Sequence, residues 1–224
     1  MAFFKQPATG TAEPGRYGAL LIVLIASYLL SAFIKARWIE AVQVVLFTVA
    51  VLLALRSASI PRRAVRLVLI TAVVGLPVMF ILSFSTATGD TGSGIADIWT
   101  ALVLLAAAVM IVRRVLAFGT VTLQSIYGAL SAYLVIGFMF AAAFAAIYHF
   151  SGDAFFRPGE TANTQTFQYF SYTTLTTLGY GDFTAGYSTG RAVAVLEALT
   201  GQVFLATLVA RLVAAFRAPA DRQG

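Results

Sequence analysis

Residues 173–182 read TTLTTLGYGD, a hydroxyl-rich stretch that ends in glycine, tyrosine, glycine and aspartate. Over 178–181 two glycines alternate with leucine and tyrosine. Glycine adopts positive φ angles at little cost, so this alternation permits a backbone in which successive carbonyl groups point to one side. The stretch lies between two long apolar runs, at about 126–148 and 188–216. An ordinary turn is the alternative interpretation, and the position between two apolar runs argues against it.

The composition indicates an integral membrane protein. Of the 224 residues, 60% are hydrophobic and only 11% are charged, so a soluble domain would expose long uncharged runs to water. The net charge is +6, but the basic residues lie at the ends of apolar runs, which argues against nucleic-acid binding. Cysteine is absent, which excludes disulfides and Cys-based metal sites. No catalytic constellation is visible, so we expect neither an enzyme nor a cofactor.

Six apolar runs are long enough for membrane-spanning helices, which need roughly 20 mostly apolar residues. They lie at about 17–34, 38–55, 67–84, 95–118, 126–148 and 188–216. The third contains Gly75 and Pro77, which predict a kink. Between the last two runs, a polar loop at 151–164 precedes a short segment at 166–177 that mixes aromatic and hydroxyl side chains. A helix that enters the membrane and returns fits the length of that segment.

The basic residues favour a cytoplasmic location for both chain ends. With the N-terminus inside, eleven of the 15 lysines and arginines fall on the cytoplasmic side, as the positive-inside rule requires. The outer loops then receive Asp90, Asp97, Asp153, Glu160 and Asp182. A cleaved signal peptide ending near Ser31-Ala32-Phe33 is the alternative, although the first apolar run is longer than a typical signal core. We expect a multi-pass protein of a prokaryotic plasma membrane.

Backbone oxygens over 177–181 suit a narrow passage for a dehydrated monovalent cation. A filter that passes potassium and rejects sodium replaces the hydration shell with a short row of oxygen ligands. The two glycines permit inward-pointing carbonyl groups, and the Thr177 hydroxyl adds an oxygen at the inner end.

The stretch 173–182 closely resembles the pore loop of tetrameric potassium channels, whose filter carries valine at the position of Leu178. The resemblance is strongest over 167–216 and extends to the preceding apolar run from Gly128 onward. The first four runs share only the six-helix layout of the voltage-gated-like branch. The resemblance implies an all-α homotetramer, in which each subunit contributes a re-entrant pore helix and a filter strand. The expected divisions are 1–16 (cytoplasmic segment), 17–118 (four-helix peripheral domain), 119–217 (pore domain) and 218–224 (cytoplasmic tail).

The resemblance also implies roles for individual residues. The filter that coordinates potassium would comprise Thr177, Leu178, Gly179, Tyr180 and Gly181. The short helix would end near Thr176, with the negative end of its dipole toward a central cavity. Support for the filter would come from Thr173, Thr176, Asp182, Tyr169, Phe170 and Glu197. An aromatic cuff would comprise Phe167, Tyr169, Phe170 and Tyr172, with lipid-facing packing as the alternative for any one of them.

Two departures from the family pattern concern how firmly the filter is held. Thr173 stands where some members carry a glutamate, so a carboxylate brace to Asp182 is missing there. Phe170 stands where many members carry tryptophan, and it cannot donate a hydrogen bond to the Tyr180 hydroxyl. Tyr169 is the remaining candidate donor to Asp182.

Polar and small residues in the last apolar run are further candidates. Glu197 is a carboxylate in a spanning segment, where charge is costly and usually functional. We expect it behind the short helix, bonded to hydroxyls there, rather than in the ion path. Gly201 is either a hinge or a small residue for close helix packing. Gln202 and Thr207 are candidates to line the cavity, and His149 is expected at a helix end near the membrane interface.

The fourth apolar run lacks the series of arginines that voltage sensing requires. Its two arginines, Arg113 and Arg114, lie at the cytoplasmic end and are interpreted as topology anchors. We therefore expect a potassium-selective channel subunit with little or no voltage dependence, with membrane lipid and potassium ions as partners. A weakly selective cation channel, a potassium-transporter subunit and a non-conducting scaffold are the alternatives.

Overall fold

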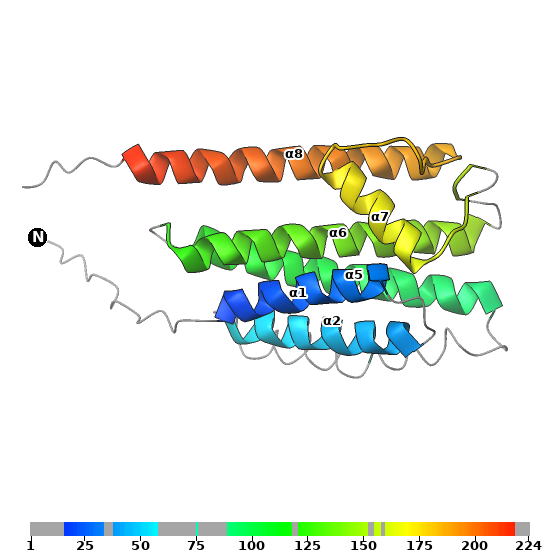
Figure 1. Ribbon diagram of the computed structural model, residues 1–224, viewed down its shortest axis with the longest axis horizontal. Coiled ribbons are helices and arrows are strands. Elements are labelled where there is room, and N and C mark those ends of the chain that lie inside the picture. Colours follow the sequence, from blue (N-terminus) through cyan, green and yellow to red (C-terminus); the bar gives the residue numbers. More distant parts are fainter. Residues whose placement is uncertain are drawn as a thin grey trace, which may run out of the picture.

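The computed structural model describes residues 16–33, 38–57, 75, 89–117, 121–151, 155–157 and 160–217. These parts are helical, apart from loops and one antiparallel bridge between Phe156 and Ala185. The helices are α1 (Arg16–Phe33), α2 (Trp38–Ser57), α5 (Gly89–Leu116), α6 (Leu123–Ser151), α7 (Thr164–Leu175) and α8 (Ser188–Arg217) (Figure 1). The fold of the described residues is thus all-α, as expected.

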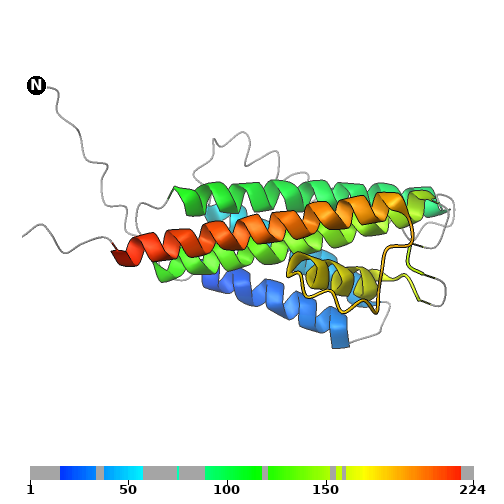
Figure 2. The ribbon, with the colours of Figure 1, turned by 90° about the horizontal axis from the view of Figure 1, so that it is seen from above.

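Among the described residues, three helices are long and apolar enough to cross a membrane. They are α5, α6 and α8, which lie side by side along the long axis of the molecule (Figures 1 and 2). Helices α1 and α2 lie where the first two apolar runs were expected. The third run, 67–84, falls outside the described residues except for Gly75.

Helix α5 begins earlier than expected, which corrects the position of two acidic residues. It starts at Gly89, so Asp90 lies in its first turn and Asp97 further along the helix, and neither lies in an outer loop. An acid in the first turn is favourable because it lies beside the positive end of the helix dipole. His149 lies in the last turn of α6, with its Nε2 3.8 Å from Oδ2 of Asp97. The helix-end position expected for His149 is therefore the one observed.

Helix α6 is the centre of the packing, because it contacts α1, α5, α7 and α8. One continuous buried cluster joins side chains from five helices, including Leu24 of α1, Ile111 of α5, Val135 of α6 and Leu175 of α7. The connection between α5 and α6 is short, at 117–122, so the two helices pack as neighbours within one chain. The peripheral helices therefore pack directly against the helix that leads into the candidate site.

Helix α7 is short and has well-defined ends. The Asn163 side chain accepts a hydrogen bond from Thr166 N, and Thr166 Oγ1 accepts one from Asn163 N, which together form a capping box. The helix ends at Leu175, with Thr176 as its C-cap, close to the end expected from the sequence. It lies obliquely between α6 and α8 (Figure 1).

Two buried glycines allow α7 to approach its neighbours closely. A Cβ atom on Gly137 of α6 would overlap the ring of Tyr172, and one on Gly201 of α8 would overlap the carbonyl oxygen of Leu175. Of the two roles considered for Gly201, close helix packing is supported by this contact.

Replacing Gly201 with alanine should destabilise the protein, because α7 or α8 would have to move away from the added methyl group. Overpacking of this kind costs about 1–3 kcal/mol, and it should lower the thermal unfolding midpoint in detergent. The matched control is Gly18→Ala in α1, where the new Cβ would lie 3.8 Å from the Tyr127 ring, an ordinary contact. Equal midpoints for the two variants would rule out the packing role.

Candidate functional site

The loop after α7 has an alternating backbone. Thr177, Gly179 and Gly181 have positive φ angles of 58°, 48° and 80°, and they alternate with Leu178 and Tyr180. Thr177 is the one non-glycine residue with positive φ in the described part of the chain, and this conformation is unfavourable for a residue with a side chain. The glycine pattern in the sequence predicted the alternation, and the structure extends it to Thr177.

Carbonyl groups at the C-terminal end of α7 anchor this loop. Thr177 N donates to Thr174 O at 2.9 Å, and Gly179 N donates to Thr173 O at 3.1 Å. These bonds satisfy carbonyl groups that a helix end otherwise leaves unpaired. Thr173 thus contacts the loop through its backbone oxygen, while its hydroxyl donates to Phe170 O.

Residues 176–182 are exposed in the single chain. Leu178 is 55% exposed and Tyr180 is 68% exposed, and a Cβ added to either Gly179 or Gly181 would meet no atom within 4 Å. Helix α8 is also sparsely covered, since 11% of its apolar span is buried within the chain, against 50% of that of α6. Exposed apolar surface of this extent marks a region that contacts lipid or another protein chain.

Tyr169 joins α7 to the outer end of the loop. Its hydroxyl donates a hydrogen bond of 2.8 Å to Oδ2 of Asp182, as the sequence suggested. This bond, together with desolvation, raises the pKa of Tyr169 to about 12. The hydroxyl therefore stays protonated at neutral pH and remains a donor.

The aromatic cuff does not form within one chain. Phe167 and Phe170 are buried in a cluster of rings with Phe144, Phe155 and Phe156. Tyr172 points to the peripheral side, where its hydroxyl donates to Leu134 O and its ring contacts Tyr28 and Phe138. Tyr169 is the member of the four whose side chain forms a hydrogen bond with the loop. The other three pack into the core of their own chain rather than facing lipid.

Glu197 lies behind α7, at the position expected for it. It is fully buried, and its Oε1 is in hydrogen-bond contact with the hydroxyl of Ser171. The same hydroxyl lies 2.7 Å from the carbonyl oxygen of Gly137. Glu197, Ser171 and Gly137 thus connect α8, α7 and α6.

Two further side chains contact the ends of the loop and α7. Gln202 Nε2 of α8 donates to Thr177 Oγ1 at 2.8 Å, so this residue contacts the first residue of the loop. The Tyr133 hydroxyl of α6 donates to Leu175 O at 3.0 Å. Sequence reasoning did not identify Tyr133 or Ser171, because isolated hydroxyl side chains in apolar helices carry no distinctive pattern.

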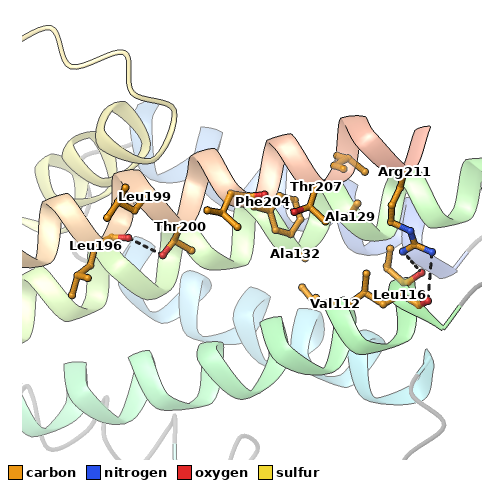
Figure 3. A pocket seen from close by; sticks show the side chains of 13 residues that line it. Val112, Leu116, Ala129, Ala132, Leu196, Leu199, Thr200, Phe204, Thr207 and Arg211 are labelled. Carbon is orange, nitrogen blue, oxygen red and sulfur yellow. Dashed lines mark hydrogen bonds between the residues drawn. The ribbon is translucent and has the colours of Figure 1, made fainter. Parts of the chain in front are cut away.

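An apolar cavity of about 480 Å³ lies between α5, α6 and α8, and its lining runs along α8 from Leu196 to Arg211 (Figure 3). Arg211 lies at one end of it and donates hydrogen bonds to Val115 O and Leu116 O at 3.0 and 3.4 Å. A cation at this position satisfies the last carbonyl groups of α5 and complements its dipole. Arg211 thereby connects the end of α5 to the end of α8, at a distance from the loop.

Replacing Tyr169 with phenylalanine should loosen the outer end of the loop, because Asp182 loses its donor. A hydrogen bond contributes about 1 kcal/mol net, which corresponds to roughly fivefold faster amide exchange where local opening exposes the amide groups. Hydrogen exchange measured over 177–182 should show this increase. Tyr187→Phe, at an exposed tyrosine in the connection between α7 and α8, is the control, and equal exchange in both variants would show that the Tyr169 bond does not hold the loop.

One of the comparisons with known proteins found a match. The family model described as "Ion channel" matches residues 130–218, which cover most of α6, all of α7, the loop and α8. The match spans less than half of the 224 residues. No curated protein and no solved structure matches the chain. Together with three apolar helices of spanning length, the match supports a membrane protein with an ion-channel domain over 130–218.

Proposed function

We propose that this chain is a subunit of a potassium-selective channel, in which four copies arrange their 177–181 segments around one axis. The observation that carries the proposal is the alternation of positive φ angles along an exposed loop. The loop lies within the region that is similar to ion channels. A row of backbone oxygens with this geometry can replace the hydration shell of a potassium ion.

The exposure of the loop supports assembly from several copies. A dehydrated cation needs oxygen ligands on all sides, and one strand offers them from one side only. The loop is exposed, and α8 is the least covered of the three described spanning helices. A ring of copies would cover both regions and enclose the row of oxygens.

The helix that precedes the loop would assist the passage of ions. The C-terminal end of α7 carries the negative end of its dipole, and it lies at Leu175, next to the inner end of the loop. It would lower the free energy of a cation that waits there for dehydration. The Thr177 hydroxyl would add an oxygen at this end, and Asp182 would contribute negative charge at the outer end.

The remaining parts would have supporting roles. Residues 119–217 would form the pore domain and residues 17–118 the peripheral domain, with both chain ends in the cytoplasm. Helix α5 carries Arg113 and Arg114 in its last turn, where they cross little of the membrane field. We therefore expect at most weak voltage dependence, and a steep conductance–voltage curve from the purified protein would contradict it.

A weakly selective cation channel is a second candidate. In its favour, Thr173 offers no carboxylate and Phe170 is buried in a cluster of rings and has no donor group, so Tyr169 is the side chain that braces the outer end of the loop within one chain. A loosely held filter discriminates less between ions of different size. Reversal potentials in mixed potassium and sodium solutions distinguish the two functions.

Liposomes that hold only this protein should show a flux driven by a potassium gradient, and barium should block it. A sodium gradient of the same size should drive no such flux. Gly179→Ala should abolish the flux, because alanine disfavours the positive φ angle at this position. Its thermal unfolding midpoint should fall only modestly, because the strain of the positive φ angle costs about 1–2 kcal/mol and the added Cβ would contact nothing else in the chain. Gly18→Ala serves as the conducting control. Flux through Gly179→Ala at the wild-type level would refute the assignment of the filter.

A further inference from the structure

A proton on Glu197 follows from the contacts around Ser171. The Ser171 hydroxyl lies between α6, α7 and α8, and both Ser171 and Glu197 are 0% exposed. Two oxygen atoms are within hydrogen-bond reach of this hydroxyl, namely Gly137 O at 2.7 Å and Oε1 of Glu197. The contact with Gly137 O has the ordinary length of a hydrogen bond between oxygens, and the contact with Glu197 is shorter than that.

The hydroxyl cannot supply a proton to both contacts. A serine carries one O–H group, and a backbone carbonyl oxygen can only accept. Two oxygens at such a distance with no proton between them repel each other. We infer that Glu197 is a protonated, neutral carboxylic acid that donates to Ser171, and that Ser171 donates in turn to the Gly137 carbonyl.

The surroundings of Glu197 favour the neutral form. The titratable groups that face it are Tyr133 of α6 and Tyr172 of α7, and their hydroxyls donate elsewhere, to Leu175 O and Leu134 O. No cationic side chain of the described residues pairs with Glu197. Its Oε2 is buried and has no hydrogen-bond partner. An ionised carboxylate would hold an uncompensated charge there, whereas a neutral acid leaves one uncharged oxygen unpaired.

This assignment does not depend on how the copies assemble. Glu197 is already inaccessible within one chain, so a neighbouring copy cannot provide it with a counter-charge by direct contact. The proton completes a chain of two hydrogen bonds that joins α8 to α7 and α7 to α6. Glu197 is thus a positioning residue, which holds α7 in place behind the 177–181 loop and lies outside the ion path.

Infrared spectroscopy tests the protonation state directly. At neutral pH the protein, in a detergent without ester groups, should show a carbonyl band of a protonated carboxylic acid that shifts in D₂O. Glu197→Gln should lose this band, and Asp90→Asn, which changes an exposed acid at the start of α5, should keep it. A wild-type spectrum without the band, or a band that survives in Glu197→Gln, would overturn the inference.

A second variant covers the case in which Glu197→Gln does not fold. Ser171→Ala keeps the carboxylic acid but removes its acceptor, so the band should remain and shift to a different frequency. An unshifted band would show that the acid does not donate to Ser171. Since these measurements do not use ion flux, a failure of this inference is distinguishable from a failure of the proposed function.

Discussion

The arrangement of the candidate site depends on one constraint, the alternating backbone of residues 177–181. Positive φ angles at every second residue present carbonyl groups along an extended segment that pairs with no strand among the described residues. Such a segment has little stability of its own, so contacts from outside must hold it. Carbonyl groups of α7 accept the N–H groups at its inner end, Gln202 binds the Thr177 hydroxyl, and Tyr169 binds Asp182.

Helix α7 is the element through which these contacts reach the rest of the chain. Gly137 and Gly201 provide space for it on two sides, and the Tyr133 hydroxyl donates to the carbonyl oxygen of its last residue, Leu175. The contact of Ser171 with Glu197 and Gly137 ties the helix to α8 and α6 at its buried face. The position of the loop is therefore set by the packing of three helices rather than by the loop sequence alone.

The peripheral helices extend this support. Side chains of α1, α2 and α5 share one buried cluster with α6 and with the end of α7, and Arg211 binds the last carbonyl groups of α5. A displacement of α5 would therefore be transmitted to α6 by direct contact and to α8 through the Arg211 bonds. This arrangement gives the peripheral part a mechanical connection to α6 and, through Arg211, to α8, although α5 has no ladder of charges.

The sequence by itself determined the membrane class, the short helix and the glycine alternation, because length, apolar character and backbone freedom are local properties. The contacts of Tyr169 and Glu197 were expected from the resemblance of the pore loop. The sequence misjudged the start of α5, since polar residues such as Asp90 and Asp97 can extend a helix beyond its apolar part. Only the tertiary structure decided that Phe170 and Tyr172 pack into the core, that Tyr133 binds the end of α7, that Ser171 contacts α6 and α8, and that Arg211 contacts α5. These contacts join residues distant in the chain, and the direction in which a side chain points depends on how whole helices pack.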